Sequence, residues 1–413
     1  MKRWLALSVA VALGAVGCAG CAVHIPPIPE NAYEVTPPRD LEGALEEQVG
    51  ERFRPDNQIA LSENGQVFHD IAAAISKAKV SVNIVTFIWR PSGPSDEVLV
   101  PLLERARAGV KCRVVVDALG SRRFAGQVRP LLEGAGCEVR MHRPREDDVL
   151  ERNHRKIVVV DGVTGITGGF GIWKSWEGNG LEKDEWRDSN VVVRGPVVRE
   201  LQRAFEASWI QAGGDPLPAG DLLAPPPAGD TRALFVASGA QDLDGGADRT
   251  RVERATVLLI RSATKRIWIA NSYFVPSTEI LSLLVAKSKS GVDVRVLAPG
   301  PIHDWTSIRA AQRDGYPELV AAGVKIFEYQ PSMMHSKTMV VDDRLVIIGS
   351  TNLDPLSLRQ MEEGSLVVED AALARELEQH LEQDFRWSKA ILHPTAGPYA
   401  WASRLVVWLI GKL

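Results

Sequence analysis

An eight-residue pattern occurs twice in the 413-residue chain. It reads HRKIVVVD at 154–161 and HSKTMVVD at 335–342, so each copy has a histidine, a lysine two residues later and an aspartate seven residues later. The copies start 181 residues apart (335 minus 154). This duplication constrains the fold strongly, because both copies must occupy similar structural settings.

The similarity extends well beyond the two copies of the pattern. Four pairs of segments resemble each other: 80–92 and 265–277, 108–120 and 290–300, 133–144 and 320–331, and 188–209 and 363–387. The pairs predict one structural unit of roughly 160 residues that is present twice. We place the units at 52–211 and 231–390, with the Pro-, Gly- and Ala-rich segment 212–230 as the linker.

Each unit alternates strand-like and helix-like segments. The run 80–88 is apolar and β-branched, 96–109 has helical spacing and ends at a glycine, and 111–117 is strand-like again. Strand, helix and strand with short connections predict parallel strands in a layered α/β fold. The segments that follow the two patterns predict hairpins with turns at Asp161-Gly162 and Asp342-Asp343. Each sheet should therefore be mixed.

The N-terminus has the layout of an export signal. Two basic residues precede an apolar stretch at 5–16, and small residues lead to Cys18. The segment resembles a bacterial lipoprotein signal, which predicts a signal peptide over 1–18 and lipidation of Cys18, with Cys21 as the alternative site. Ordinary cleavage and an uncleaved anchor are the competing interpretations.

The regions outside the two units have their own compositions. Residues 19–51 carry several prolines and acids and predict a tether. Residues 391–413 form an amphipathic tail, which either lies on a membrane surface or packs as a terminal helix. Together with the export signal, they predict a lipid-anchored protein of the bacterial cell envelope that faces the periplasm or the exterior.

Two further cysteines, Cys112 and Cys137, lie in strand-like runs beside helix-like segments. Outside the cytoplasm they could form a disulfide. We expect two buried free thiols instead, because small buried cysteines are common. The cysteines have no metal-binding spacing, and we expect neither a metal nor a cofactor. The formal net charge of −4 gives no indication of nucleic-acid binding by the whole chain.

The spacing of the repeated pattern separates its parts. In a strand, residues two apart share a face, so His154 projects with Lys156, and His335 projects with Lys337. Histidine beside lysine suits a phosphate group, because lysine neutralises the anion and imidazole attacks phosphorus or carries a proton. Two such pairs facing each other would supply one attacking group and one proton donor.

The aspartates of the pattern, Asp161 and Asp342, fall at an odd offset and at the hairpin turns. We expect them to brace the turns instead of pointing into the site. Two other carboxylates, Asp188 and Glu363, stand three residues before the matching strand-like runs 191–194 and 366–369. A carboxylate bonded to one imidazole nitrogen fixes its tautomer and stabilises its charged form, so we expect these two to orient the histidines.

Other chemically active side chains are weaker candidates. His303 and Asp304 could line a cleft between the units, although we expect them to be solvent-exposed in a loop. The many tryptophans are expected to anchor the core or an interface.

These residues resemble the phospholipase D superfamily, which is marked by two His-x-Lys-x4-Asp motifs. The resemblance covers roughly residues 52–390, and the second half is similar to bacterial cardiolipin synthases in "YFVPS", "MHSKTMVVDD" and "GSTNLDPLSL". It implies two tandem α/β/α sandwich units with mixed sheets, related by a pseudo-two-fold axis, and one shared active site.

The resemblance also implies residue roles. His154 would be the nucleophile that forms a phosphohistidine, and His335 would be the general acid. Ser350 and Asn352 would contact the phosphate, in the family's Gly-Ser-x-Asn segment. No metal or other cofactor would take part, and water or an alcohol would accept the phosphatidyl group.

Four positions depart from the family pattern. Gly171 stands where Asn is usual, Leu356 where Arg is usual, and Met361 and Glu362 where Asn and Phe are usual. We expect these changes near the acceptor side of the site.

The sequence thus predicts a membrane-associated phosphodiesterase or phosphatidyltransferase that acts on glycerophospholipids. Synthesis of cardiolipin from phosphatidylglycerol is one expected reaction, with phospholipid and a membrane surface as the partners. The alternative is an exported nuclease of the same superfamily, because its substrate is also a phosphodiester.

Overall fold

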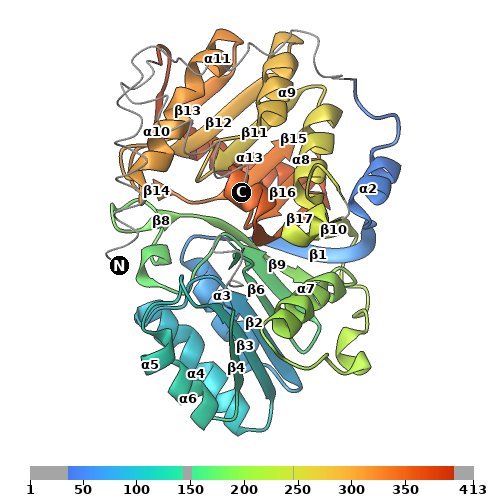
Figure 1. Cartoon of the computed structure of the whole chain (residues 1–413), viewed down its shortest axis with the longest axis vertical. Helices are drawn as coiled ribbons and strands as arrows, with labels where there is room; N and C mark the ends of the chain where they lie inside the picture. The colour runs from blue at the N-terminus through green and yellow to red at the C-terminus, as the bar shows by residue number, and fades with distance from the viewer. Residues whose placement is uncertain (1–35, 143–150, 245, 395–413) are drawn as a thin grey trace. The chain divides into compact units, whose positions relative to one another are not determined.

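The two repeated units each contribute one half of a large mixed β-sheet. The computed structural model describes residues 36–142, 151–244 and 246–394, which belong to one compact unit of the chain (Figure 1). The signal peptide 1–18, the first part of the tether and most of the tail lie outside the described residues.

The first half-sheet runs in the order β1-β9-β7-β6-β2-β3-β4. Strands β2, β3 and β4 are parallel, and the remaining neighbours are antiparallel. The predicted mixed sheet and the hairpin β6–β7 are therefore confirmed. The strands are β1 (Arg54–Glu63), β2 (Ser81–Thr86), β3 (Lys111–Asp117), β4 (Glu138–His142), β6 (Ile157–Val160), β7 (Thr164–Gly168) and β9 (Ser189–Arg194).

The second half-sheet repeats this order as β10-β17-β16-β15-β11-β12-β13, with β18 (Ser388–Ala390) added at its edge. The antiparallel pair β1–β10 joins the two halves into one continuous sheet. The strands are β10 (Thr231–Ser238), β11 (Arg266–Asn271), β12 (Asp293–Pro299), β13 (Lys325–Tyr329), β15 (Lys337–Val341), β16 (Leu345–Gly349) and β17 (Met361–Glu369).

Helices cover both faces of each half-sheet. On the outer faces lie α3 (Gln66–Ser76), α4 (Gly93–Arg107), α5 (Phe124–Gln127), α6 (Arg129–Gly134), α8 (Arg251–Ser262), α9 (Thr278–Lys289), α10 (Thr306–Asp314) and α11 (Tyr316–Ala321) (Figure 1). On the inner faces lie α7 (Val198–Gln211) and α13 (Ala371–Arg386).

One central core joins the two halves. It combines side chains of α7 and α13 with strand residues from both half-sheets, including Phe205, Trp209, Phe235 and Phe385. Outer cores fill the space under α3 and α4 in the first half, and under α8 and α9 in the second. Burial of one shared apolar core favours a fixed arrangement of the halves.

Part of the predicted tether is a packed helix. Helix α2 (Leu41–Val49) lies against α8 of the second half and buries Leu45 and Val49 there. Asp40 caps it, because its carboxylate accepts from the backbone N–H of Gly43. The chain thus packs on the second half before it enters β1 of the first.

The predicted linker 212–230 also makes packing contacts. Leu217 is buried in the central core, and Arg113 donates to the Asp221 carboxylate at 3.2 Å. The N–H groups of Ala228 and Gly229 both donate to the carbonyl of Asp56. These contacts hold the linker against the first half.

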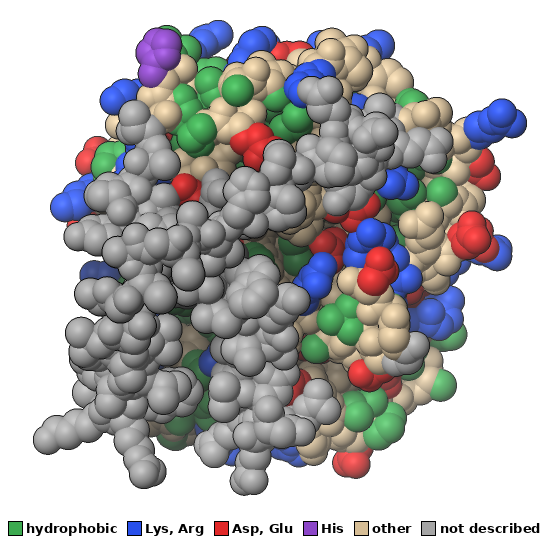
Figure 2. Space-filling view, turned by 45° about the horizontal axis from the view of Figure 1, so that its top comes forward, with side chains coloured by type: hydrophobic (Ala, Val, Ile, Leu, Met, Phe, Trp, Pro, Cys, Tyr) green, Lys and Arg blue, Asp and Glu red, His purple; other side chains and the backbone are tan. Residues whose placement is uncertain are grey.

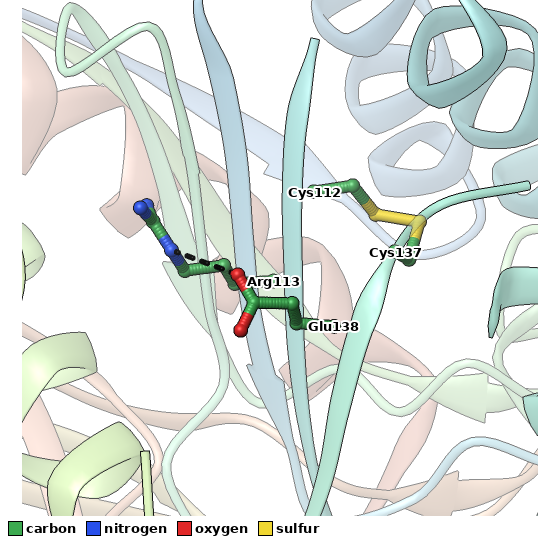
Figure 3. The surroundings of a disulfide bond; sticks show 4 residues. All are labelled: Cys112, Arg113, Cys137 and Glu138. Atoms are coloured by element: carbon green, nitrogen blue, oxygen red, sulfur yellow. Dashed lines mark ion pairs between the residues drawn. A yellow bond between two sulfur atoms is a disulfide. The ribbon is translucent and has the colours of Figure 1, made fainter. Parts of the chain in front are cut away.

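The prediction of free thiols at Cys112 and Cys137 is wrong, because the two residues form a disulfide (Figure 3). Cys112 lies in β3, and Cys137 directly precedes β4, its parallel neighbour. The register aligns Arg113 with Glu138, so the two cysteines come to lie side by side, with their Cα atoms 4.5 Å apart. The second half has buried Val294 and Val324 at the matching positions.

None of the described helices is long and apolar enough to cross a membrane.

Candidate active site

Short strand pairs between the units bring the two histidines together. In the first pair, β5 (Arg152–Asn153) lies parallel to the start of β17, and the N–H of His154 donates to Glu362 O at 2.9 Å. In the second, β14 (Met333–Met334) lies parallel to β8 (Trp186–Arg187), and the N–H of His335 donates to Arg187 O at 2.7 Å. Each histidine is therefore placed by the other unit.

The same strand pairs give each histidine a carboxylate from the opposite unit. Nδ1 of His154 donates to Oε1 of Glu363 at 2.9 Å, and Nδ1 of His335 donates to Oδ2 of Asp188 at 2.7 Å. Both carboxylates are fully buried. With the hydrogen held at Nδ1, Nε2 of each neutral ring keeps its lone pair. Glu363 lies within β17, so that strand begins earlier than predicted.

Further donors hold each carboxylate. The hydroxyl groups of Ser350 and Ser357 donate to Glu363. Its counterpart Asp188 accepts from the Trp176 indole N–H at 2.7 Å and from the backbone N–H of Ser189 at 2.9 Å. The sequence did not predict a role for Ser357 or Trp176. The two residues nevertheless occupy matching places in the repeat, because Ser357 lies five residues after position 352, Trp176 lies five residues after position 171, and these two positions are aligned.

Ser350 therefore differs from its predicted role. Its hydroxyl hydrogen is used by the buried Glu363 carboxylate, so it has none left for a phosphate. Asn352 remains a candidate phosphate contact, because it is buried and its amide Nδ2 donates to no group among the described residues.

The departure at Gly171 has a steric reason. A Cβ atom at this position would lie 2.9 Å from the ring of Trp176, so that ring fills the space of a side chain. A Cβ at Gly169 would lie 2.2 Å from Asp188 Oδ1. The first unit thus holds its carboxylate with an indole, and the second unit does so with hydroxyl groups.

The two lysines have different surroundings. Nζ of Lys156 donates to His154 O at 2.6 Å and lies 5.5 Å from the ring centre of Phe87. Nζ of Lys337 donates to the hydroxyl of Ser272 and to His335 O. Phe87 and Ser272 are matching positions of the repeat, so the difference comes from that substitution.

Burial controls the electrostatics of all four groups. It lowers the pKa of Lys156 to about 7 and that of Lys337 to about 8, against the attraction of the carboxylates. Burial lowers the pKa of His154 to about 4; Glu363 opposes this effect, and Lys156 adds to it. Burial and Lys337 hold the pKa of His335 well below its usual value. The two lysines give the site positive charge that favours binding of an anion. A bound anion would in turn favour the protonated form of a histidine.

Aromatic rings enclose His335. Trp186 stacks on it with centroids 4.9 Å apart, and Trp176 meets it edge-on at 5.0 Å. Phe87 meets His154 edge-on at 5.0 Å. Some of the tryptophans that we expected in the core or an interface thus form the walls of the site.

The aspartates of the repeated pattern brace the turns, as predicted. Asp161 accepts from the backbone N–H groups of Lys79, Val80 and Ser81, ahead of β2. Asp342 accepts in the same way from residues 264–266, ahead of β11. Each aspartate thus ties a hairpin turn to the start of the neighbouring strand.

The departure at Glu362 lies elsewhere than predicted. Its carboxylate pairs with the guanidinium of Arg155 at 2.5 Å, and both side chains are buried between the units. Arg155 also donates to Ser208 Oγ and to the carbonyls of Glu363 and Ser238. Glu362 therefore links the two halves of the protein and does not contribute to a binding site for the acceptor alcohol.

His303 also differs from its predicted exposure. Its imidazole is fully buried and stacks on Tyr273, with centroids 5.7 Å apart. The neighbouring Asp304 is one-third exposed, at 33%.

Within the described residues, no group of three or more His, Cys, Asp or Glu side chains could hold a metal ion.

Comparison with known proteins adds a family to this geometry. Residues 71–209 and 257–385 match the family model "Cardiolipin synthase, PLD-like domain". The chain is 36% identical over 309 residues to the cardiolipin synthase of Geobacillus kaustophilus HTA426, which covers 72% of this chain and 60% of the relative. It is 35% identical over 344 residues to cardiolipin synthase A of Pseudomonas putida GB-1. That alignment covers 81% of this chain and 70% of the relative. The chain thus spans only about 60% of the length of the first relative.

Solved structures show the same fold. The phosphatidylserine synthase of Haemophilus influenzae Rd KW20 superposes with a TM-score of 0.62 at 15% identity, over 90% of this chain and 96% of that one. The polyphosphate kinase of Porphyromonas gingivalis superposes with a TM-score of 0.54 at 14% identity. The superposition covers 95% of this chain and 59% of that one.

Proposed function

Since the chain belongs to the cardiolipin synthase family with phospholipase D-like domains, we propose that it is a phosphatidyltransferase that acts on glycerophospholipids through a phosphohistidine. The observation that carries this proposal is the pair of buried histidines, each hydrogen-bonded to a carboxylate of the opposite unit. Such a pair supplies one nucleophile and one proton carrier to a single phosphodiester.

In the first step, Nε2 of His154 attacks the phosphorus atom. The bond from phosphorus to the leaving alcohol breaks, and His335, which the bound anionic phosphate favours in its protonated form, gives its Nε2 proton to the departing oxygen. Glu363 stabilises the positive charge that develops on His154, in the manner of a catalytic triad. The family resemblance is the basis for the order of the two histidines.

In the second step, an acceptor hydroxyl gives its proton to His335, and its oxygen attacks the phosphorus. The bond between phosphorus and His154 breaks, which restores the starting state. Lys156 and Lys337 neutralise the non-bridging oxygens in both steps. With phosphatidylglycerol as donor and acceptor, the products are cardiolipin and glycerol.

The two units are proposed to span 52–211 and 231–390. The matched half-sheets and the β1–β10 pairing support this division. One shared site between the units explains why the pattern occurs twice, because one phosphodiester needs both an attacking group and a proton carrier.

We place the enzyme at a membrane surface of the bacterial cell envelope, outside the cytoplasm. The export-type N-terminus with Cys18 supports this location. The Cys112–Cys137 disulfide supports it independently, because structural disulfides persist in oxidising compartments.

An exported nuclease is the competing function, and one experiment separates the two. The full chain in detergent is incubated with phosphatidylglycerol vesicles and, separately, with plasmid DNA. We expect cardiolipin and phosphatidic acid from the lipid, and their loss in His154→Ala. Cleavage of DNA without lipid turnover would favour the nuclease. On the coloured part of the face in Figure 2, basic and acidic side chains are interspersed, whereas a nucleic-acid groove is predominantly basic.

A further inference from the structure

We infer that Asp304 binds a second hydroxyl group of the alcohol that leaves or attacks the phosphorus, which makes the enzyme selective for vicinal diols over water and simple alcohols. The inference rests on the proposed function and assigns an acceptor subsite to the second unit. It concerns a specificity-determining residue that the repeated pattern does not contain.

The topology places Asp304 at the same sheet edge as the second histidine. Strands β11 and β12 are parallel neighbours, and Tyr273 and Asp304 follow their carboxyl ends. At this edge Asn271 of β11 is paired with Lys337 of β15. The next residue, Ser272, donates its hydroxyl hydrogen to His335 O at 2.9 Å. The loops that carry Tyr273 and Asp304 thus start beside the site.

Asp304 is held in place with one oxygen left over. Oη of Tyr273 donates to Oδ2 of Asp304 at 2.7 Å. The ring of Tyr273 is fixed by stacking on His303, whose Nδ1 accepts from the backbone N–H of Trp305 at 2.9 Å. His303 Nδ1 lies 3.4 Å from Oδ1 of Asp304 but, as an acceptor, does not donate to it. Apart from the His303 ring, no group of the described residues pairs with Oδ1.

Asp304 also lies close to the groups that would exchange the proton. Its charge raises the pKa of His335, against the stronger lowering by burial and by Lys337. It raises the pKa of Lys337 in the same way, again against burial. Together with the topology, these effects put a partly exposed carboxylate at the edge of the site that holds His335, the histidine that serves the leaving and attacking alcohols.

The chemistry of the site suits a polyol. The reacting hydroxyl gives its proton to His335 while its oxygen bonds to phosphorus and the bond to His154 breaks. A neighbouring hydroxyl donates a hydrogen bond to Asp304, which exchanges no proton. Water and monohydric alcohols have no second hydroxyl to offer. The leaving alcohol takes its proton from the same histidine, His335, in the first step. A glycerol headgroup therefore gains the contact with Asp304 both as leaving group and as acceptor.

The first unit has no equivalent of this pair. Ile88 stands at the position that matches Tyr273, and the segment 118–123 after β3 reads ALGSRR, without an acidic residue. Asp117, the last residue of β3, is buried, and its carboxylate accepts from the backbone N–H groups of Leu119, Gly120 and Asn153. The partly exposed carboxylate of Asp304 therefore breaks the pseudo-symmetry of the site and marks the second unit as the side of the exchanging alcohol.

Competing acceptors test the inference. The full chain in detergent is supplied with phosphatidylglycerol and an equal mixture of 1,2-propanediol and 1-propanol, which differ by one hydroxyl. The measured quantity is the ratio of the two phosphatidyl alcohols, determined by mass spectrometry. We expect the wild type to favour the diol, and Asp304→Ala to reduce this preference roughly tenfold, as for loss of a hydrogen bond to a charged group. Asp304→Asn should lose less, because its amide oxygen still accepts.

Two further variants keep the test decisive. Tyr273→Phe frees the carboxylate from its anchor and should lower the preference by a smaller factor, even if Asp304→Ala does not fold. Asp248→Asn removes a well-exposed charge and should leave the preference unchanged. An unaltered ratio in Asp304→Ala, or in Tyr273→Phe if that alone folds, would overturn the inference. Failure of the proposed function would instead appear as no consumption of phosphatidylglycerol by the wild type.

Discussion

Glu363 of the second unit hydrogen-bonds His154 of the first, with Oε1 2.9 Å from Nδ1. The reciprocal pair, Asp188 and His335, runs in the opposite direction at 2.7 Å. Neither unit therefore contains a complete histidine–carboxylate pair. Formation of the site depends on the register of β5 with β17 and of β14 with β8.

The crossed carboxylates should act on different steps. Glu363→Gln and Asp188→Asn should each lower kcat by about 10²- to 10⁴-fold with little change in KM, because an amide no longer stabilises the charged imidazole. Steady-state assays with phosphatidylglycerol provide the first measurement. A donor with a p-nitrophenolate leaving group provides the second, because this group needs no proton to depart.

The two variants should then separate. The first-turnover burst of p-nitrophenolate should be nearly restored in Asp188→Asn, because His335 is then needed only to activate the acceptor in the second step. It should stay slow in Glu363→Gln, whose defect lies in the nucleophile. Equal recovery in both variants would contradict the crossed assignment.

The lysines predict a pH dependence of substrate binding. Burial lowers the pKa of Lys156 to about 7 and that of Lys337 to about 8. Each lysine is charged below its pKa, so the site loses positive charge as the pH rises through 7 and 8. We expect KM for phosphatidylglycerol to increase over this range, measured on mixed micelles of constant composition. Lys156→Arg keeps its charge and should show a shallower rise; a KM that stays constant to pH 9 in the wild type would refute the prediction.

The Arg155–Glu362 pair predicts a stability effect at the unit boundary. Glu362→Gln leaves a buried guanidinium without its anionic partner and should cost about 3 kcal/mol, which corresponds to a lower Tm by several degrees. Arg155→Met combined with Glu362→Met should recover part of the loss, because no buried charge remains. Differential scanning calorimetry measures both. A Tm of Glu362→Gln equal to that of the wild type would argue against this pairing.

The disulfide predicts a redox-dependent Tm. Its partners are 25 residues apart, and closure of such a loop stabilises a folded chain by about 3 kcal/mol. Reduction should lower the Tm of the wild type. The double variant Cys112→Val, Cys137→Val copies the second unit and should melt near the reduced protein, with or without reductant. If reductant leaves the wild-type Tm unchanged, the disulfide does not contribute to stability.

Local patterns in the sequence were sufficient to predict the strands, the hairpins and the turn-bracing aspartates. The period-two spacing of His154 and Lys156, and the odd offset of Asp161, follow directly from strand geometry. The repeat also indicated that Asp188 and Glu363 are equivalent. These features depend on residues that are close along the chain or matched by the duplication.

The missed features depend on contacts between distant segments. Pairing of Cys112 with Cys137 requires the β3–β4 register, and the sequence alone shows only two apolar runs. The Arg155–Glu362 ion pair and the burial of His303 likewise arise from tertiary packing. Helix α2 was missed because prolines and acids dominate its segment, while a few apolar residues determine its packing.

The most direct test of the mechanism is a single-turnover measurement of p-nitrophenolate release from a phosphatidyl p-nitrophenol donor. His335→Ala lacks the group that activates the acceptor, so it should release one equivalent per enzyme and stop with a phosphatidyl group on His154, located by peptide mass spectrometry. His154→Ala should give no burst and no adduct. A burst from His154→Ala with an adduct on His335 would contradict the assigned roles, and turnover by both variants without an adduct would contradict covalent catalysis.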